Sequence, residues 1–203
     1  MDKYTSAKIK VISFFLMILV VIIHAYNFET KSIGETLANT HGYSYYIQEF
    51  LSNGLSRIAV PLFFMISGYF YFTNLNGTLA GFIPKYKKRF KTLVIPFLLW
   101  SIWGLIVFSL LQAIPYSKPF FTNKLIAAYT AIELLGALFI NPIPYQLWFL
   151  RDLILLIILS PLIYYAISAF KYGVVALLMM AWLFGINMKI LTMDALNFFV
   201  LGA

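Results

Sequence analysis

Apolar stretches separated by short polar segments make up most of the chain. A helix needs about 20 predominantly apolar residues to cross a bilayer. Several stretches reach or approach that length, and a further apolar run begins at Ala195. The predicted spans are residues 11–26, 58–72, 92–114, 147–169 and 174–186. The pattern therefore predicts an all-α fold, a polytopic transmembrane helix bundle with about five complete spans and the start of a sixth.

Two segments between the spans need interpretation. Residues 74–91 are polar and basic, and we expect them to form a loop. Residues 125–140 are moderately apolar but contain Glu133 and Gly136, and prolines flank them. This segment could cross the membrane or stay on the outer side as an interfacial or re-entrant segment. A carboxylate in mid-segment is costly in hydrocarbon, so we favour the second interpretation.

The last apolar run has only nine residues before the sequence stops at Ala203. We therefore expect residues 1–203 to form a single membrane domain that is the N-terminal part of a larger bundle. The alternative is a truncated gene product, which we expect to be inactive.

The composition supports a membrane protein and excludes some chemistry. Hydrophobic residues make up 62% of the chain and charged residues 11%, whereas soluble domains have about 45–50% and about 25%. The net charge of +8 would suggest a nucleic-acid partner in a soluble protein. In a membrane protein it first reports orientation, and we expect no nucleic acid. The absence of cysteine excludes thiol catalysis, and we expect no metal site.

The charges are distributed unequally between the two sides of the predicted bundle. With the N-terminus in the cytoplasm and residues 125–140 outside, the cytoplasmic segments carry the acid Asp2 and nine cations: Lys3, Lys8, Lys10, Lys85, Lys87, Lys88, Arg89, Lys91 and Lys171. The outer segments have balanced charge, from Lys31, Arg57, Lys118, Lys124, Arg151 and Lys189 against Glu29, Glu35, Glu49, Glu133, Asp152 and Asp194. The positive-inside rule then predicts a multi-pass protein of the cell membrane with a cytoplasmic N-terminus.

His24 is a candidate catalytic residue in the first span. It lies thirteen residues after Val11, which places it about 20 Å into the span, in the outer half of the membrane. Imidazole exchanges protons near neutral pH and is the common general base of enzymes. The alternative is an interfacial histidine hydrogen-bonded at a helix end.

Charged residues also lie at the outer edges of the second and fourth spans. They are Arg57, Arg151 and Asp152. Adjacent residues on a helix point in different directions, so we expect Arg151 and Asp152 to have partners on other helices. Glu49 would share a helix face with Arg57 if the second helix begins that early. The alternative role for both arginines is a snorkelling anchor at the interface.

The basic segment around residue 88 has two possible roles. Its cations could serve as the orientation signal and contact anionic membrane lipid. They could also bind a phosphorylated cytoplasmic donor, for which a group of lysines and arginines is the expected receiver. The candidate donor-binding residues are Lys85, Lys87, Lys88 and Arg89.

Four segments together resemble the acyltransferase 3 family of integral-membrane O-acyltransferases, through their order and spacing. They are residues 8–27 (KIKVISFFLMILVVIIHAYN), 57–72 (RIAVPLFFMISGYFYF), 88–100 (KRFKTLVIPFLLW) and 146–160 (QLWFLRDLILLIILS). Residues 198–203 (FFVLGA) also resemble the start of a later family helix.

The resemblance implies transfer of an acyl group, usually acetyl, to a hydroxyl of an extracytoplasmic or lipid-linked glycan. Acyl-CoA (acetyl-CoA) would be a co-substrate, with no bound cofactor. By resemblance His24 is the catalytic histidine. Many family members carry an arginine eleven residues before it, where this chain has Ser13. Lys10, one turn earlier on the same face, could substitute.

These observations combine into one mechanistic hypothesis and one alternative. The basic cluster of Lys85, Lys87, Lys88 and Arg89 would attract the donor phosphates. His24 would take a proton from the acceptor hydroxyl or carry the acyl group. Arg57 and Arg151 would stabilise the oxyanion or hold Asp152 and the glycan. The alternative is a related membrane domain that transports or senses a small molecule without acyl transfer.

Overall fold

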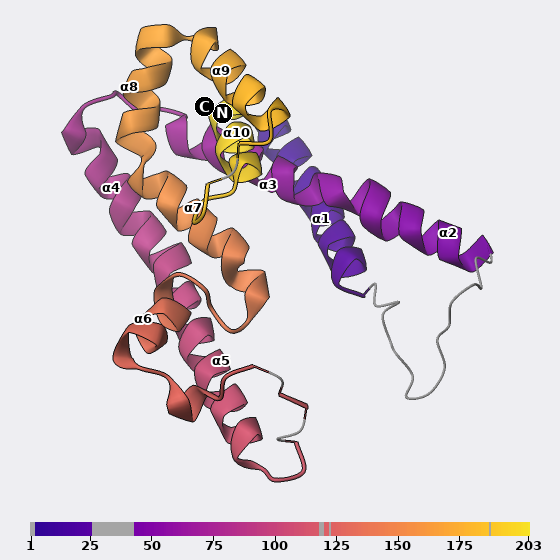
Figure 1. Ribbon diagram of the computed structural model, residues 1–203. Coiled ribbons are helices and arrows are strands. Elements are labelled where there is room, and N and C mark those ends of the chain that lie inside the picture. Colours follow the sequence, from indigo (N-terminus) through magenta and orange to yellow (C-terminus); the bar gives the residue numbers. More distant parts are fainter. Residues whose placement is uncertain (1–2, 26–42, 118–119, 122, 187) are drawn as a thin grey trace. The chain divides into compact units, whose positions relative to one another are not determined.

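The computed structural model describes residues 3–25, 43–117, 120–121, 123–186 and 188–203. All regular elements in these ranges are helical, as predicted. They belong to two compact units, one of Met1–Phe70 with Phe198–Ala203 and one of Tyr71–Asn197. Figure 1 shows the helices. Some residues used in the predictions lie outside the described residues. They are Tyr26 of the first predicted span, and Asp2, Glu29, Lys31, Glu35 and Lys118 of the charge distribution.

The first unit contains the described part of the first predicted span and most of the second, whose last two residues belong to the second unit. α1 (Lys3–Ala25) packs against a π-helical turn, Phe50–Gly54, and a 3-10 turn, Leu55–Ile58. These turns connect α2 (Tyr43–Glu49) to α3 (Ala59–Phe72). The second helical stretch therefore begins well before residue 58, which agrees with the earlier start considered for it.

α1 has the surface of a helix that faces lipid. Its 23 residues span about 35 Å, enough to cross the hydrocarbon core. Phe14 and Val21 are 64% and 66% exposed, and only Leu16 is buried within this helix. Water would not favour such exposure of large apolar side chains. The first predicted span therefore corresponds to α1.

The third predicted span begins earlier than the hydropathy pattern indicated. α4 (Leu79–Arg89) continues through a π-helical turn, Phe90–Val94, into α5 (Ile95–Ala113). The expectation of a loop over residues 74–91 is wrong for most of that segment. The Thr78 hydroxyl caps α4 by accepting a hydrogen bond from the Gly81 amide at 3.2 Å, and lysine and arginine are good helix formers.

The fourth predicted span is a bent pair of helices. α7 (Trp148–Ile158) and α8 (Ser160–Phe170) meet at an angle of 61°. Pro161, at the start of α8, has no amide hydrogen to donate to the preceding turn, which accounts for the bend. α9 (Tyr172–Leu183) follows as an apolar helix of twelve residues, about 18 Å long, which is less than a full crossing.

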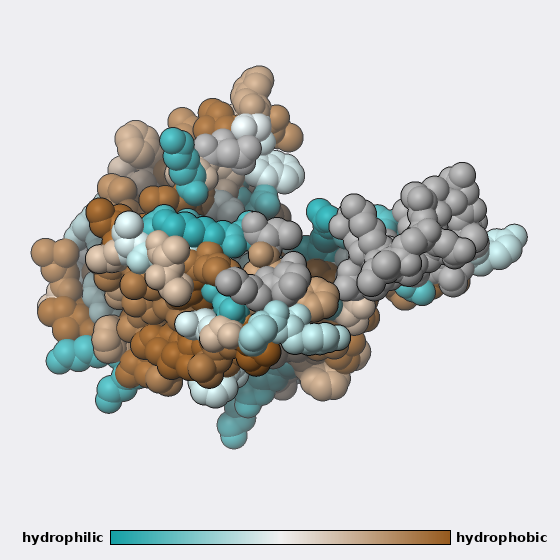
Figure 2. Space-filling model, turned by 60° about the horizontal axis from the view of Figure 1, so that its bottom comes forward, coloured by the Kyte–Doolittle hydropathy of each residue, from teal (hydrophilic) through white to brown (hydrophobic). Residues whose placement is uncertain are grey.

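By length and composition, three helices among the described residues could cross a membrane. They are Lys3–Ala25, Tyr46–Phe72 and Leu79–Ala113, and the bent pair makes a fourth if it counts as one span. About five complete spans were predicted. The fold is an all-α membrane bundle, and apolar side chains cover much of the face shown in Figure 2.

The segment over residues 125–140 holds only one short α-helix, α6 (Ala131–Phe139). Its nine residues span about 14 Å, less than half of the hydrocarbon core. Glu133 and Thr130 form a reciprocal capping box at its start. The carboxylate in mid-segment thus begins a short helix, which supports the non-crossing interpretation.

α10 (Met193–Leu201) corresponds to the start of the sixth predicted span. Its last residues belong to the first unit, where they pack closely on α3. A Cβ at Gly68 would collide with the backbone carbonyl of Phe199, and one at Gly202 would collide with that of Met65. These two glycines therefore permit a direct backbone contact between the helices.

Aromatic side chains fill the interior of the second unit near the start of α8. The rings of Phe72 and Phe82 lie 6.4 Å and 6.0 Å from that of Tyr164, centroid to centroid. Ser160 donates through its hydroxyl to the buried Tyr71 hydroxyl at 2.8 Å. These contacts fix the first turns of α4 and α8 against each other.

Candidate functional site: a basic cavity and two polar clusters

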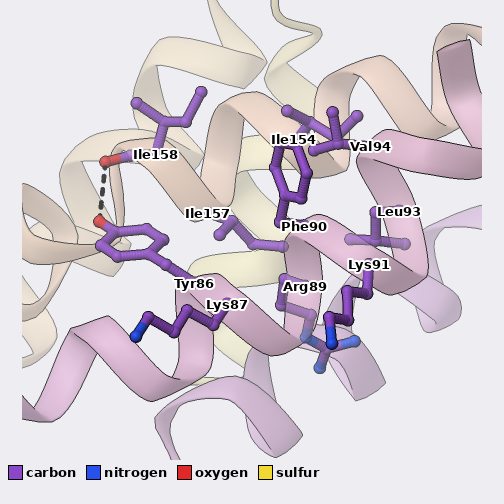
Figure 3. Close-up of a pocket in the computed structure, with 10 residues that line it drawn as sticks. All are labelled: Tyr86, Lys87, Arg89, Phe90, Lys91, Leu93, Val94, Ile154, Ile157 and Ile158. Carbon is purple, nitrogen blue, oxygen red and sulfur yellow. Dashed lines mark hydrogen bonds between the residues drawn. The ribbon is translucent and has the colours of Figure 1, made fainter.

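The basic helix α4 and the turn after it form one wall of a cavity in the second unit. The cavity has a volume of about 660 Å³, within the range of ligand pockets. It is lined by Tyr86, Lys87, Arg89, Phe90, Lys91, Leu93, Val94, Ile154, Ile157 and Ile158. In Figure 3 the cations lie along one edge, whereas the isoleucines of α7 form the opposite wall.

A hydrogen bond between α4 and the end of α7 connects two walls of this cavity. Tyr86 donates its hydroxyl hydrogen to the carbonyl of Ile158, the last residue of α7, at 3.3 Å (Figure 3). This bond joins the basic helix to the isoleucine wall. An apolar wall beside a cationic edge suits a ligand with an anionic head and an apolar portion.

The predicted donor-binding residues divide into two groups. Lys87 and Arg89 line the cavity, whereas Lys85 and Lys88 do not. Lys85 donates to the carbonyls of Tyr71 and Thr73, the latter at 2.7 Å, and so caps the end of α3 within the second unit. A cation suits this position because a helix C-terminus carries partial negative charge.

Eight lining residues were not among the candidates, and three of them are Lys91, Tyr86 and Phe90. Lys91 belongs to the same run of cations, and Tyr86 lies inside it. Their place on the cavity depends on the π-helical turn Phe90–Val94, which changes the direction in which successive side chains point. The run of basic residues in the sequence indicated that a site lies here. The sequence did not indicate the π-helical turn that determines which of its side chains line the cavity.

Arg151 and Asp152 bond to each other, which was not expected of two adjacent residues on a helix. Arg151 donates through Nε and Nη2 to Asp152 Oδ1 at 3.0 and 2.8 Å. The arginine side chain is long enough to fold back onto its neighbour. The side chain of Asp152 is 0% exposed and that of Arg151 is 15% exposed.

Both residues also bond to other elements of the second unit. Thr192 donates through its amide and its hydroxyl to Asp152 Oδ2, at 3.0 and 2.8 Å. Arg151 Nη1 donates to the carbonyl of Ile140, at the end of α6, at 2.8 Å. The pair thus ties α7 to the end of α6 and to the residue that precedes α10. Thr192 was missed, although a threonine before an apolar helix is a typical cap.

Arg57 belongs to a polar ladder in the first unit. It donates through Nη2 to Asn53 Oδ1 at 3.2 Å, and Asn53 Nδ2 donates to both carboxylate oxygens of Glu49 at 2.9 Å. The three residues lie four apart along one side of the helical stretch, as neighbours on a helix face do. The predicted shared face of Glu49 and Arg57 is confirmed.

His24 lies in the last turn of α1 and its side chain is exposed. Lys10 is also exposed on α1, fourteen residues earlier, which corresponds to about 21 Å along the helix axis. The first unit contains His24, Lys10 and Arg57. The second unit contains the basic cavity and the pair Arg151 and Asp152. The described residues contain no group of three or more His, Asp or Glu that could hold a metal ion.

A curated protein with a similar sequence is a succinoglycan biosynthesis protein, ExoH, of Rhizobium meliloti (strain 1021). It is 31% identical over 174 residues, which are 84% of this chain and 45% of the relative. The chain thus spans about half the length of this relative. No solved structure matches the chain.

The family comparison covers almost the whole sequence. Residues 7–203 match the acyltransferase 3 family, which is described as an acyltransferase domain. The match includes most of α1, the basic helix α4 and the bent pair α7 and α8. The chain therefore belongs to the acyltransferase 3 family.

Proposed function

We propose that the protein is a membrane acyltransferase that moves an acyl group, acetyl in the simplest case, from a cytoplasmic acyl-CoA to a hydroxyl of an extracytoplasmic or lipid-linked glycan. The observation that carries the proposal is the basic cavity between α4 and α7. Membership of an acyltransferase family supports the reaction class. The name of the similar protein, which refers to succinoglycan biosynthesis, supports a saccharide acceptor.

The residues that line the cavity support an acyl-CoA as its ligand. Coenzyme A combines several phosphate charges with a long, less polar arm that ends in the thioester. Arg89 offers a planar fork of donors that matches phosphate, and Lys87 and Lys91 add positive charge. The isoleucines of α7 would contact the arm. Acyl-CoA acts here as a co-substrate, and the proposal needs no bound cofactor.

The transfer itself requires a base and a path for the proton. In the proposed reaction His24 takes the proton of the acceptor hydroxyl, and the hydroxyl oxygen attacks the thioester carbonyl carbon. The carbon–sulfur bond then breaks, and the leaving thiolate of coenzyme A receives the proton. An ester and free coenzyme A result, without any oxidant or reductant. In a two-step form of the reaction, the imidazole carries the acyl group before the acceptor takes it.

The direction of transfer follows from the proposed orientation. The cations of α4 precede α5 on the helical stretch Leu79–Ala113, which is long enough to cross the membrane. The positive-inside rule assigns that end to the cytoplasm, together with the N-terminus. Acyl-CoA is a cytoplasmic metabolite, so the cavity would open on the side where the donor is found.

Acetyl transfer by the full-length protein in lipid vesicles tests the donor site. We expect Arg89→Gln to raise the KM for acetyl-CoA about tenfold, the effect of one lost hydrogen bond to a charged group, with little change in kcat. Lys171→Gln is the matched control because Lys171 is an exposed cation away from the cavity. Equal KM values for both variants would contradict donor binding at this cavity.

His24→Ala separates catalysis from binding. We expect it to abolish acetyl transfer while the protein still binds acetyl-CoA, since His24 and the cavity belong to different units. Unchanged transfer at normal protein levels would exclude the role of His24. Movement of a small molecule across the vesicle membrane without acyl-CoA dependence would instead favour the transport alternative.

A further inference from the structure

A second cavity lies at the other end of α5. It has a volume of about 340 Å³, close to the lower limit of about 300 Å³ for ligand pockets. Its lining includes Phe108, Gln112, Phe121, Lys124, Tyr129 and Asn141. Aromatic rings and side-chain amides therefore surround a space of the size of a small molecule.

The two cavities lie at opposite ends of one helical stretch. Phe90 lines the basic cavity and Gln112 the second one. They are 22 residues apart, which corresponds to about 33 Å along a helix. The hydrocarbon core of a bilayer is about 30 Å thick, so the cavities would open toward opposite faces of the membrane.

The positive charge of Lys124, which lines the second cavity, is neutralised by an ion pair. Lys124 Nζ lies 2.7 Å from both carboxylate oxygens of Glu133, which balances its charge. The basic cavity has three cations on its lining. The chemistry at the two ends of α5 therefore differs, and a neutral ligand suits the second cavity better than a phosphate does.

The polar side chains of the cavity suit a ligand with many hydroxyl groups. Gln112 Oε1 accepts from the Ile126 amide at 2.8 Å, which directs the two amide hydrogens of Gln112 elsewhere. Asn141 adds a second amide, and an amide both donates and accepts. A hydroxyl group likewise does both, so several such groups would pair well with this lining.

The aromatic side chains suit the apolar part of the same ligand. The rings of Phe108 and Phe121 meet edge to face, with centroids 6.0 Å apart, and Tyr129 also lines the cavity. A sugar ring has an apolar C–H face as well as hydroxyl groups at its rim. An aromatic surface beside amides can contact both parts at once.

We infer that this cavity binds a neutral saccharide unit, which would be part of the acceptor glycan. The identification as an acceptor site rests on the proposed function, whereas saccharide binding itself does not. The volume of about 340 Å³ favours a short saccharide unit over a longer chain.

Saturation-transfer NMR on the protein in lipid nanodiscs tests the inference, with methyl β-glucoside and methyl β-galactoside as probes. We expect at least one probe to bind, and Asn141→Ala to weaken its binding about fivefold, the effect of one lost hydrogen bond. Gln146→Ala is the matched control because this exposed amide lies five residues away and outside the lining. We expect it to bind the probe as the unchanged protein does.

Several results would overturn the inference. They are no binding of either glycoside, equal affinity of Asn141→Ala and Gln146→Ala, and displacement of the bound probe by inorganic phosphate. Equal unfolding temperatures of the variants would show that the fold is intact, and Asn123→Ala provides a second lining variant. The binding assay contains no acyl-CoA. Its result on saccharide binding therefore stays valid even if the protein fails to transfer an acyl group.

Discussion

At the scale of single residues, Asp152 shows that a charged group in this protein can have a structural task. It is 0% exposed, and its two oxygens accept bonds from Arg151 and Thr192. These contacts occupy the carboxylate without any substrate. A role for the pair in holding the end of α6 and the start of α10 therefore fits the geometry better than direct contact with a glycan.

Replacement of Asp152 tests this structural role. Asp152→Asn keeps the shape of the side chain but leaves Arg151 without its counter-charge, and we expect a loss of about 3 kcal/mol in the free energy of unfolding. Asp194→Asn is the control, because Asp194 is exposed and accepts from Trp182 Nε1 at 2.6 Å. We expect it to change stability by less than about 0.5 kcal/mol. Denaturation in detergent would measure both, and equal losses would contradict the role.

Glu133 gives a prediction of pH dependence at the same scale. The hydrogen bond from Lys124, with further bonds from Thr130, lowers the pKa of Glu133 from 4.5 to about 2. A lowered pKa in the folded state means that these bonds stabilise the protein above the unfolded pKa of 4.5. Their contribution is lost as the pH falls from there through about 2.

The titration of Glu133 can be followed through the NMR signal of the Thr130 amide, which donates to Glu133 at 2.7 Å. We expect a midpoint near pH 2 in the unchanged protein and a higher midpoint in Lys124→Gln. Lys189→Gln, an exposed cation elsewhere in the chain, should leave the midpoint unchanged. An unaltered midpoint in Lys124→Gln would contradict this account of the shift.

At the scale of elements, glycine determines how closely two helices meet. Gly68 on α3 lies so close to the Phe199 carbonyl that a methyl group has no space. The obstacle is backbone, which cannot move aside as a flexible side chain can. The close contact of α3 with the end of α10 thus depends on the missing Cβ atoms of Gly68 and Gly202.

Alanine substitution should therefore have opposite effects at two helical glycines. We expect Gly68→Ala to lower the free energy of unfolding by about 1–3 kcal/mol because the helices must separate. Gly136→Ala in α6 meets nothing within 4 Å, so we expect a gain of about 0.5–1 kcal/mol from the better helix propensity of alanine. Thermal unfolding in detergent measures both, and a stable Gly68→Ala variant would contradict the close contact.

Hydropathy predicted the order and approximate place of most helices, because apolar length is a property of each segment alone. It did not predict the bend before Pro161, since prolines also occur in membrane helices that remain continuous. Nor could it predict the bonds of Asp152, because Thr192 lies 40 residues away in the sequence. The basic cluster was recognised, but the capping role of Lys85 depends on where α3 ends.

At the scale of the whole molecule, the proposed function depends on which face of the membrane each cavity meets. The chain contains no cysteine, so a single introduced cysteine can report its own accessibility. Lys88 and Gln146 are both exposed and line neither cavity. They lie on either side of α5 in the sequence and serve as reporters for its two ends.

Labelling with a membrane-impermeant maleimide tests the orientation in intact cells. We expect Gln146→Cys to react from outside, whereas Lys88→Cys should react only after the membrane is opened, because the positive-inside rule predicts that its basic segment lies in the cytoplasm. The unchanged chain, without cysteine, is the background control. The reverse labelling pattern would exclude a cytoplasmic donor cavity.

The π-helical turn Phe90–Val94 sets the rotational phase between the basic helix α4 and the membrane helix α5. A π turn holds one residue more than an α-turn, so each residue before it is rotated by about 100° relative to an unbroken helix. Deleting Thr92 alone would close the turn and rotate the α4 side chains by that angle. Lys87 and Arg89 would then leave the isoleucine wall, although every charge and every apolar residue of the cavity would still be present.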